Sequence, residues 1–143
     1  MKVSDIMTRQ VVKIHPEESV EVAARILERY NIGLLPVCSA EGALCGVITD
    51  RDLVTRCVAV GKSPAQTPVR QIMSNAVRCA SPNMEVGTAA HLMGRCQVRR
   101  LPVVENGVLC GVVSLGDMAS CPDSVMNAAD ALSDITENIR EMD

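Results

Sequence analysis

Hydroxyl, carboxylate and guanidinium groups gather in the stretch Gly46–Asp52, at the end of an apolar run. Thr49 precedes Asp52 by three positions, and Ser114 precedes Asp117 in a second copy of the stretch. A hydroxyl three residues before an acid is the pattern of a capping box, whose side chains bind free amides at a helix start. The same groups suit a ligand, because an acid in dinucleotide-binding folds accepts ribose hydroxyls. From spacing alone, we rank helix capping above ligand binding.

The repetition extends beyond this motif and divides the chain into two similar halves. The turn before the motif shortens by one residue in the second half, where VENG replaces CSAEG. A unit of about 60 residues buries too little surface to be comfortably stable alone, so we expect the two halves to share burial. The matching residues are Ile6-Met7 with Ile72-Met73, Pro16 with Pro82, Val20 with Val86, Ala23-Ala24 with Ala89-Ala90, and Pro36 with Pro102.

Apolar periodicity and turn residues predict a strand, helix, strand, strand, helix order in each half, which is an α/β (α+β) fold. Asn31 and Gly33 are expected to stop the first long helix, and Pro36 interrupts the strand that follows it. In the first half, the predicted elements are a helical turn at 3–7, a strand at 11–14, a helix after Pro16, strands at 34–38 and 43–48, and a helix at 49–60 that ends at Gly61.

The predicted organisation has two repeats, a connector and a tail. The tail carries apolar residues at helical spacing, which predicts an additional amphipathic helix that covers a partner or a dimer face. Its stripe consists of Val125, Ala128, Ala129, Leu132, Ile135 and Ile139. We expect repeat 1 at residues 1–61, a linker at 62–68, repeat 2 at 69–121, and the C-terminal helix and tail at 122–143.

Composition disfavours several classes of function. The net charge is −3, and the chain has no Trp, no Phe and one Tyr, so it lacks the aromatic platforms that stack unpaired bases. Nucleic acid is therefore a poor candidate partner. No apolar run approaches the roughly 20 residues of a membrane span, and the first residues lack a signal-peptide core. We expect a cytoplasmic protein that makes no membrane contact.

Residues that often carry catalysis or bind metals are scattered along this chain. His15 and His91 have no Cys, Asp or Glu at ligand spacing, and no Cys, Ser or Lys has an adjacent base to activate it. The seven cysteines are an odd number without a CxxC pair, which favours small buried hydrophobes. Cys38 and Cys45 flank a predicted hairpin and could face each other, although a reducing compartment disfavours their pairing. We expect no enzyme and no metal site.

Three repeated features together resemble the cystathionine-β-synthase (CBS) domain. They are the segments Leu34-Leu35-Pro36 and Arg100-Leu101-Pro102, the glycine-led strands, and the closing hydroxyl and acid. Over residues 3 to 121 the chain resembles a tandem CBS pair, or Bateman module, of the kind found in small stand-alone bacterial proteins. The resemblance implies two units related by a pseudo-twofold axis, with two clefts that bind AMP, ADP, ATP or S-adenosylmethionine. It also implies a sensor without catalysis that forms homodimers.

The resemblance also implies roles for individual residues. Ribose hydroxyls would be held by the acids and hydroxyls of the motif, adenine by backbone beside the first strands, and phosphates by basic residues before the proline of the opposite unit. The acids that would hold the ribose hydroxyls are Asp52 and Asp117, and the hydroxyl residues beside the phosphate or ribose are Thr49 and Ser114. The residues for adenine at the first cleft are Ile32, Gly33, Leu34, Thr8 and Val12. Those for phosphates are Arg99 and Arg100, with Arg51 as a third cation near the first cleft.

The two clefts implied by the resemblance are not equivalent. Arg99 and Arg100 precede the second proline segment, whereas Gly33 and Leu34 occupy the matching positions of the first half. Guanidinium groups bind phosphates in a bidentate way, so a nucleotide on Asp52 is favoured over one on Asp117. The alternative for the two arginines is an exposed basic pair at the start of a strand. The alternative for the whole chain is a ligand-free interaction protein, in which the motif only caps helices and the C-terminal helix docks a protein partner.

Overall fold

The computed structural model describes residues 1–75 and 77–142, with side chains up to Glu137. The chain forms two compact units. Unit 1 contains residues 1–11, 78–106 and 110–143, and unit 2 contains residues 12–77 and 107–109. The units thus do not follow the sequence repeats, since the first eleven residues pack with the second half of the chain. The predicted division at residues 61 and 69 remains a prediction about the repeats.

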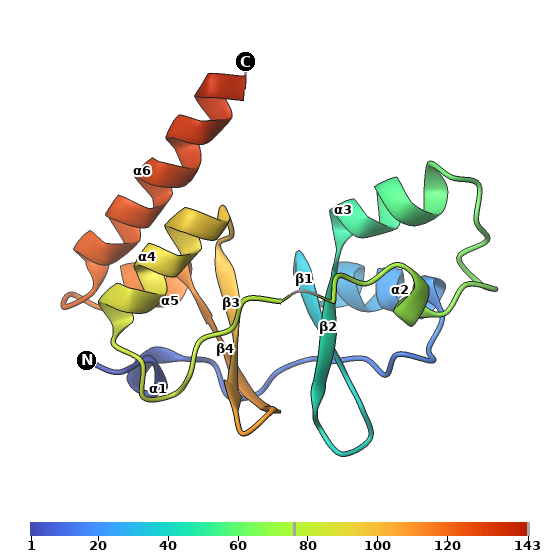
Figure 1. The fold of residues 1–143 in the computed structure, drawn as a ribbon, viewed down its shortest axis with the longest axis horizontal. Coiled ribbons are helices and arrows are strands. Elements are labelled where there is room, and N and C mark those ends of the chain that lie inside the picture. Colours follow the sequence, from blue (N-terminus) through green and yellow to red (C-terminus); the bar gives the residue numbers. More distant parts are fainter. Residues whose placement is uncertain (76, 143) are drawn as a thin grey trace. The chain divides into compact units, whose positions relative to one another are not determined.

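Unit 2 combines a small antiparallel sheet with helices (Figure 1). Its helices and strands are α2 (Val20–Tyr30), β1 (Leu34–Cys38), β2 (Leu44–Thr49), α3 (Asp50–Leu53), the π-helix η1 (Val54–Val58) and the 3₁₀-helix η2 (Val69–Gln71). Residues from these helices and strands share one core, in which Leu35, Ile48, Val69 and Ile72 are almost completely buried.

Helix α2 forms where the apolar stripe predicts it. Ser19 accepts a hydrogen bond from the Val22 amide at the N-terminus. Asn31 ends the helix in the left-handed conformation, with φ of 51°, as a C-terminal Asn can. Val20, Ala23 and Leu27 are buried, so one face of the helix joins the core of unit 2. The prediction that Asn31 stops this helix is confirmed.

Strands β1 and β2 pair from Leu34 with Thr49 to Cys38 with Leu44, and the register shifts between Val37 and Cys38. Pro36 cannot donate a hydrogen bond, but its carbonyl accepts one from the Ile14 amide on the other side of β1. This contact belongs to a single parallel bridge between Ile14 and Val37. The predicted strand at 11–14 is therefore wrong as a strand, because only one of its residues pairs.

The segment after β2 is helical, as predicted for 49–60, but it changes type along its length. Four residues form α3, and the next five form the π-helix η1, whose hydrogen bonds span one residue more than those of an α-helix. Gly61 follows with φ of 76°, which a glycine adopts without steric cost. The prediction of a regular helix over this range is corrected, and so is its end, because the helical segment stops at Val58 and residues 59–61 form a turn.

Unit 1 has its own two-stranded sheet, covered by helices (Figure 1). Its helices and strands are α1 (Val3–Ile6), α4 (Val86–Cys96), β3 (Arg100–Glu105), β4 (Val108–Ser114), α5 (Leu115–Ala119) and α6 (Val125–Met142), with the first residues of β4 belonging to unit 2. The core residues include Val3, Met93, Leu101, Val113 and Met118, which are almost completely buried.

The C-terminal helix α6 packs on α4 and α5 of its own unit. Ala128, Ala131 and Ile135 are the buried residues, whereas Val125 and Leu132 of the predicted stripe are exposed. Ala129 is also exposed, and the side chain of Ile139 lies outside the described residues. The helix that we expected to cover a partner or a dimer face therefore covers its own chain, through Ala128 and Ile135 of the predicted stripe and through Ala131.

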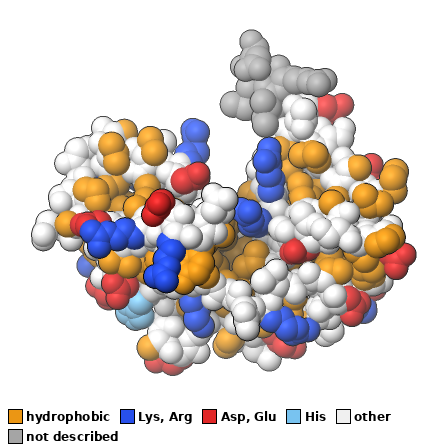
Figure 2. Space-filling view, turned by 180° about the vertical axis from the view of Figure 1, so that it is seen from behind, with side chains coloured by type: hydrophobic (Ala, Val, Ile, Leu, Met, Phe, Trp, Pro, Cys, Tyr) orange, Lys and Arg blue, Asp and Glu red, His pale blue; other side chains and the backbone are white. Residues whose placement is uncertain are grey.

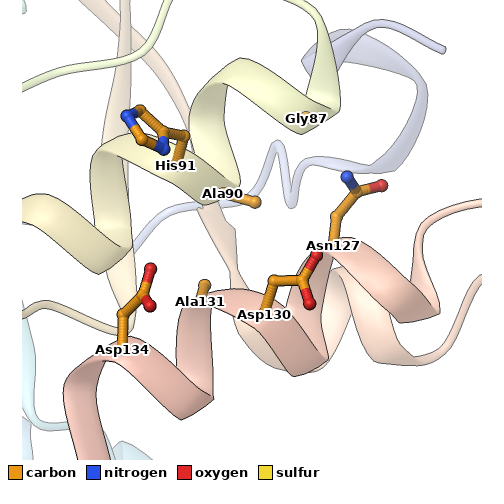
Figure 3. Close-up of a pocket in the computed structure, with 7 residues that line it drawn as sticks. All are labelled: Gly87, Ala90, His91, Asn127, Asp130, Ala131 and Asp134. Atoms are coloured by element: carbon orange, nitrogen blue, oxygen red, sulfur yellow. The ribbon is translucent and has the colours of Figure 1, made fainter. Parts of the chain in front are cut away.

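A pocket of about 170 Å³ lies between α4 and α6 (Figure 3). Its polar side chains come from both helices, with His91 on α4 and Asn127, Asp130 and Asp134 on α6. The helices approach closely at Gly94, where an added Cβ would lie 2.8 Å from Oδ2 of Asp134.

Among the described residues, no helix is both long and apolar enough to cross a membrane.

Candidate functional site

The motif in unit 2 forms a complete capping box at the start of α3. Oγ1 of Thr49 accepts a hydrogen bond from the Asp52 amide at 3.2 Å, and Oδ2 of Asp52 accepts one from the Thr49 amide at 2.9 Å. Both bonds satisfy backbone amides that the helix itself leaves without partners. The prediction that Thr49 and Asp52 cap this helix is confirmed. The capped helix start holds Asp52 in a fixed place, with the residue only 7% exposed.

The glycine that leads each motif permits a close backbone approach. A Cβ on Gly46 would lie 2.6 Å from the carbonyl oxygen of Ser74, which accepts a hydrogen bond from the Val47 amide. A Cβ on Gly111 would lie 2.8 Å from the carbonyl oxygen of Thr8. In both units, the residue that follows an Ile-Met pair therefore bridges to the second strand of the hairpin, next to its leading glycine.

Arg56 is a residue of this site that sequence reasoning missed. Its Nε lies 3.8 Å from Oδ1 of Asp52, and its Nη1 donates to the carbonyl oxygen of Ile72 at 3.2 Å. Nη1 also lies 3.4 Å from the hydroxyl oxygen of Ser74. The available signal was the spacing of four residues from Asp52, which places two helical side chains on one face. Oδ2 of Asp52 thus accepts the capping hydrogen bond from the Thr49 amide, and Oδ1 faces the guanidinium group of Arg56.

A groove of about 320 Å³ opens on the α3 side of this motif. It is lined by Asp50, Arg51, Val54 and Thr55. All four lining residues are exposed, and Thr49 and Asp52 are not among them, so the groove is an open depression of the surface. Arg51, one of the predicted ligand residues, is exposed and lines this groove.

The predicted adenine-contacting residues of the first half lie mostly in unit 2 as well. Leu34 pairs with Thr49 at one end of the β1–β2 hairpin. Ile32 closes the end of α2 by donating its amide to the carbonyl oxygen of Leu27, and Gly33 links it to β1. Val12 and Ile32 are partly buried against the core. The structure thus brings Val12, Ile32, Gly33, Leu34, Thr49, Arg51 and Asp52 into one unit.

The second copy of the motif makes the same capping box in unit 1. Oγ of Ser114 accepts from the Asp117 amide at 3.0 Å, and Oδ2 of Asp117 accepts from the Ser114 amide at 2.9 Å. Asp117 is only partly buried, and none of the described basic side chains forms an ion pair with it. Cys121 occupies the position that Arg56 holds in unit 2. The second prediction of capping is also confirmed, in surroundings with less charge.

The remaining predicted ligand residues lie in unit 1. The Thr8 amide and carbonyl bind those of Val112, so Thr8 belongs to the unit that contains Asp117. Ser74 occupies the matching place in unit 2, paired with Val47, and sequence reasoning did not select it. The Arg99 carbonyl accepts a hydrogen bond from the Leu115 amide at the start of α5.

The side chains of the arginine pair remain available to solvent. The Arg99 side chain is exposed, and Arg100 begins β3 partly exposed. No described residue forms an ion pair with either guanidinium group. Two cations without an anionic partner are consistent with an anion site, and equally with a solvated basic surface.

The described residues contain no group of three His, Cys, Asp or Glu side chains arranged to hold a metal ion. His91 lines the pocket between α4 and α6, while His15 accepts a hydrogen bond from the Glu17 amide through Nδ1. The His15 side chain therefore stabilises a local turn through this hydrogen bond. His15 belongs to unit 2 and His91 to unit 1.

Comparison with known proteins finds similar sequences and similar solved structures. The chain is 40% identical over 134 residues to the CBS domain-containing protein YhcV of Bacillus subtilis, covering 94% of both chains. It is 30% identical over 115 residues to hypoxic response protein 1 of Mycobacterium tuberculosis, covering 80% of both. A crystal structure of hypoxic response protein I with two coordinated zinc ions is 29% identical and gives a TM-score of 0.77, with 84% of this chain and 98% of that chain covered.

A further solved structure carries ligands. The CBS domain pair of protein MJ0100, in complex with 5′-methylthioadenosine and S-adenosyl-L-methionine, is 28% identical and gives a TM-score of 0.74. The match covers 84% of this chain and 94% of that chain. The family model of the CBS domain matches residues 3–59 and 69–122, which include both capping motifs. This chain belongs to the CBS-domain family and contains two copies of the domain.

Proposed function

We propose that this chain is a cytoplasmic regulatory module that binds an adenosine-containing nucleotide of the AMP, ADP or ATP class. In this proposal the chain senses the nucleotide without transforming it and needs no obligatory cofactor. CBS-domain pairs are regulatory ligand-binding modules, and a related pair binds two adenosine compounds. The observation that carries the proposal is the carboxylate of Asp52, which is almost completely buried and which the capping box holds at the start of α3.

Asp52 is the proposed ribose ligand, with Thr49 beside it. A carboxylate offers about four lone-pair positions, and the cap uses only one of them. Oδ1 lies 3.8 Å from Nε of Arg56, a loose contact that leaves this oxygen able to accept hydrogen bonds from ribose hydroxyls. The fixed cap lowers the entropic cost of binding, because the acid need not be ordered when the ribose arrives.

The other contacts of the nucleotide are proposals that come from the family resemblance. Backbone at Ile32, Gly33 and Leu34, with Thr8 and Val12, would hold the adenine. Arg99 and Arg100 would meet the phosphates, assisted by Arg51. Bidentate guanidinium contacts to phosphate are strong and orientation-specific, which favours a phosphorylated ligand over adenosine itself.

We also propose that the chain acts as a homodimer whose arrangement responds to the ligand. Val54 and Val58 of η1 are 59% and 64% exposed, and Val60 in the turn that follows is 60% exposed. Figure 2 shows hydrophobic side chains among basic ones at the surface of this unit. In unit 1, α6 covers the matching helices, but the described elements of unit 2 include no counterpart of α6. A second copy is the proposed cover for this face.

The dimer is tested by light scattering coupled to gel filtration. We expect wild-type chain to elute as a dimer and Val54→Lys/Val58→Lys to elute as a monomer, because two buried charges without partners are costly. Val108→Lys is the matched control, since Val108 is also exposed but lies at the start of β4. A monomeric wild type, or a dimeric double variant, contradicts this assignment.

A second function is an interaction protein without a ligand. It is favoured by one observation: both capping boxes close within the chain itself, so each motif already has a structural role. In that case the exposed surfaces would dock a partner protein, and neither Asp52 nor Asp117 would meet a small molecule.

A thermal-shift experiment separates these functions. AMP, ADP, ATP and S-adenosylmethionine are each added in large excess to the full chain. A ligand at 100 times its dissociation constant stabilises the folded state by about 2.7 kcal/mol, which raises the melting temperature by several degrees. A rise with at least one compound supports the sensor. No rise with any of the four supports the ligand-free interaction protein instead.

A further inference from the structure

The hairpin of unit 2 carries two thiols close to its turn. Cys38 is the last residue of β1, and Cys45 lies near the start of β2. Both are free cysteines in the structure. They lie at the opposite end of the same hairpin from Leu34 and Thr49, which belong to the candidate nucleotide site.

The strand register places these two cysteines against each other. Val37 pairs with Gly46, but the next pair is Cys38 with Leu44, so Cys45 is the extra residue of a β-bulge. In a bulge, two residues of one strand oppose a single residue of the other, and here Leu44 and Cys45 oppose Cys38. Opposed residues in antiparallel strands have Cα atoms about 4.5–5.5 Å apart, within the roughly 4.4–6.8 Å that a disulfide spans.

The two thiols differ in burial, which assigns them different roles. Cys38 is only 3% exposed, and burial raises the pKa of its thiol, although the charge of Lys13 opposes this increase in part. Cys45 is partly exposed, with its Sγ 3.6 Å from the Ala43 carbonyl oxygen. An oxidant in solution therefore reaches Cys45 first.

We propose that Cys38 and Cys45 form a redox-sensitive thiol pair that closes to an intramolecular disulfide when a small disulfide oxidant is present. The thiolate of Cys45 attacks oxidised glutathione, forms a mixed disulfide and releases one glutathione thiolate. The thiolate of Cys38 then attacks the sulfur of Cys45, which forms the Cys38–Cys45 bond and releases the second glutathione. The two cysteines lose two electrons and two protons, and one oxidised glutathione becomes two reduced molecules.

The hairpin of unit 1 provides an internal comparison. Cys110 occupies the position that corresponds to Cys45, but Val104 replaces Cys38. Sγ of Cys110 lies 3.3 Å from the Val103 carbonyl oxygen, and no thiol stands at the opposing position. The same oxidant should therefore leave Cys110 without an intramolecular partner on its own hairpin.

The full chain is equilibrated in glutathione buffers from about −300 to −180 mV, acid-quenched, alkylated and digested with trypsin. No Lys or Arg lies between Arg29 and Arg51, so one peptide of residues 30–51 contains both cysteines. We expect this peptide to lose both alkylation sites and the mass of two hydrogen atoms as the potential rises. Cys110 should remain open to alkylation or carry glutathione.

Two variants test the order of attack. Cys38→Ser should stop at the mixed disulfide of Cys45 with glutathione, and Cys45→Ser should leave Cys38 reduced and protected in the folded chain. The proposal would be overturned if both wild-type cysteines were still recovered as alkylated residues, and hence as reduced thiols, at every potential up to about −180 mV. So would a stable glutathione adduct on wild-type Cys45, or a bond from Cys45 to any cysteine other than Cys38. Because the wild-type measurement decides, a folding defect in Cys38→Ser does not weaken the test.

Discussion

The capping boxes of unit 2 and unit 1 are built alike but lie in different surroundings. Thr49 with Asp52, and Ser114 with Asp117, make the same two hydrogen bonds within a few tenths of an ångström. Four residues after the acid, unit 2 has Arg56 and unit 1 has Cys121. Because the cap is common to both units, any difference in ligand binding must come from the neighbours of the motif.

The neighbours also differ at the start of the first strand of each hairpin. Unit 1 has Arg99 and Arg100 at this point, where unit 2 has the uncharged pair Gly33 and Leu34. In unit 2 a buried acid faces its own cation, whereas in unit 1 a more open acid shares its unit with two exposed cations. The comparison teaches that the repeated motif provides a scaffold and that the variable positions determine where charge is available.

The largest expected effect concerns the arginine pair. Arg99→Ala/Arg100→Ala should weaken ATP binding about 10- to 100-fold, because each lost charged hydrogen bond contributes roughly 1.5–3 kcal/mol and water compensates in part. Binding of adenosine should change by less than about twofold, since it has no phosphate. Arg25→Ala/Arg29→Ala, which removes two exposed arginines of α2, is the charge-matched control. Equal weakening of ATP and adenosine in calorimetry would refute the phosphate role.

The next effect tests the shared scaffold. Gly46→Ala and Gly111→Ala should each lower the free energy of unfolding by about 1–3 kcal/mol, because the new methyl group collides with a backbone carbonyl oxygen. Gly116→Ala is the control: its nearest contact would be an ordinary 3.5 Å, and alanine is the better helix former by about 0.5–1 kcal/mol. Urea unfolding measures all three. An unchanged midpoint in Gly46→Ala would disprove the close approach to Ser74.

A smaller effect is expected at the cation that distinguishes unit 2. Arg56→Ala should cost about 1 kcal/mol of stability, because it removes a partly exposed ion pair and a hydrogen bond to the Ile72 carbonyl oxygen. Arg70→Ala is the comparison, since its ion pair with Glu17 at 2.9 Å lies on the surface and should contribute less. If the two variants lose the same free energy of unfolding in urea, the contacts of Arg56 contribute no more than a surface ion pair does.

The smallest effect concerns acid pH and the helix starts. α2 begins with the hydroxyl of Ser19, but α4 begins at Glu85, whose pKa is lowered by hydrogen bonds from Lys2 and the N-terminal amino group. A lowered folded-state pKa means that the contribution is present above the ordinary value of about 4.5 and is lost as pH falls through the folded value.

Glu85→Gln should therefore be slightly less stable than wild type at neutral pH and equal to it at strongly acid pH. Ser19→Ala should instead lose about 1 kcal/mol throughout, because a hydroxyl cap does not titrate in this range. Urea midpoints at several pH values measure both variants. A constant difference between wild type and Glu85→Gln at every pH would contradict the assignment.

Local features of this chain were readable from sequence. The capping boxes depend on residues three positions apart, and the end of α2 depends on Asn31 itself, so neighbouring residues suffice to predict both. The two copies of the domain followed from matches such as Pro36 with Pro102. These features have in common that their interactions are completed within one turn or one repeat.

Features that depend on distant packing were not readable. Residues 1–11 join unit 1 through contacts such as the Val3 amide with the Met84 carbonyl oxygen, which no local pattern encodes. The π-helix at 54–58 and the single bridge at Ile14 likewise depend on what packs around them. At the candidate site, Arg56 was missed because its carbonyl partners at 72 and 73 come from another part of the chain.

The most direct test of the nucleotide site compares the two acids by calorimetric titration of AMP, ADP and ATP. Asp52→Asn and Asp117→Asn each keep a side-chain oxygen that can accept the capping bond, but they remove the charge. We expect Asp52→Asn to weaken the tightest-binding nucleotide about 10- to 100-fold, as for a lost hydrogen bond to a charged group, and Asp117→Asn to weaken it less than about threefold. Equal weakening by the two variants, or greater weakening by Asp117→Asn, would contradict the assignment of the ribose to Asp52.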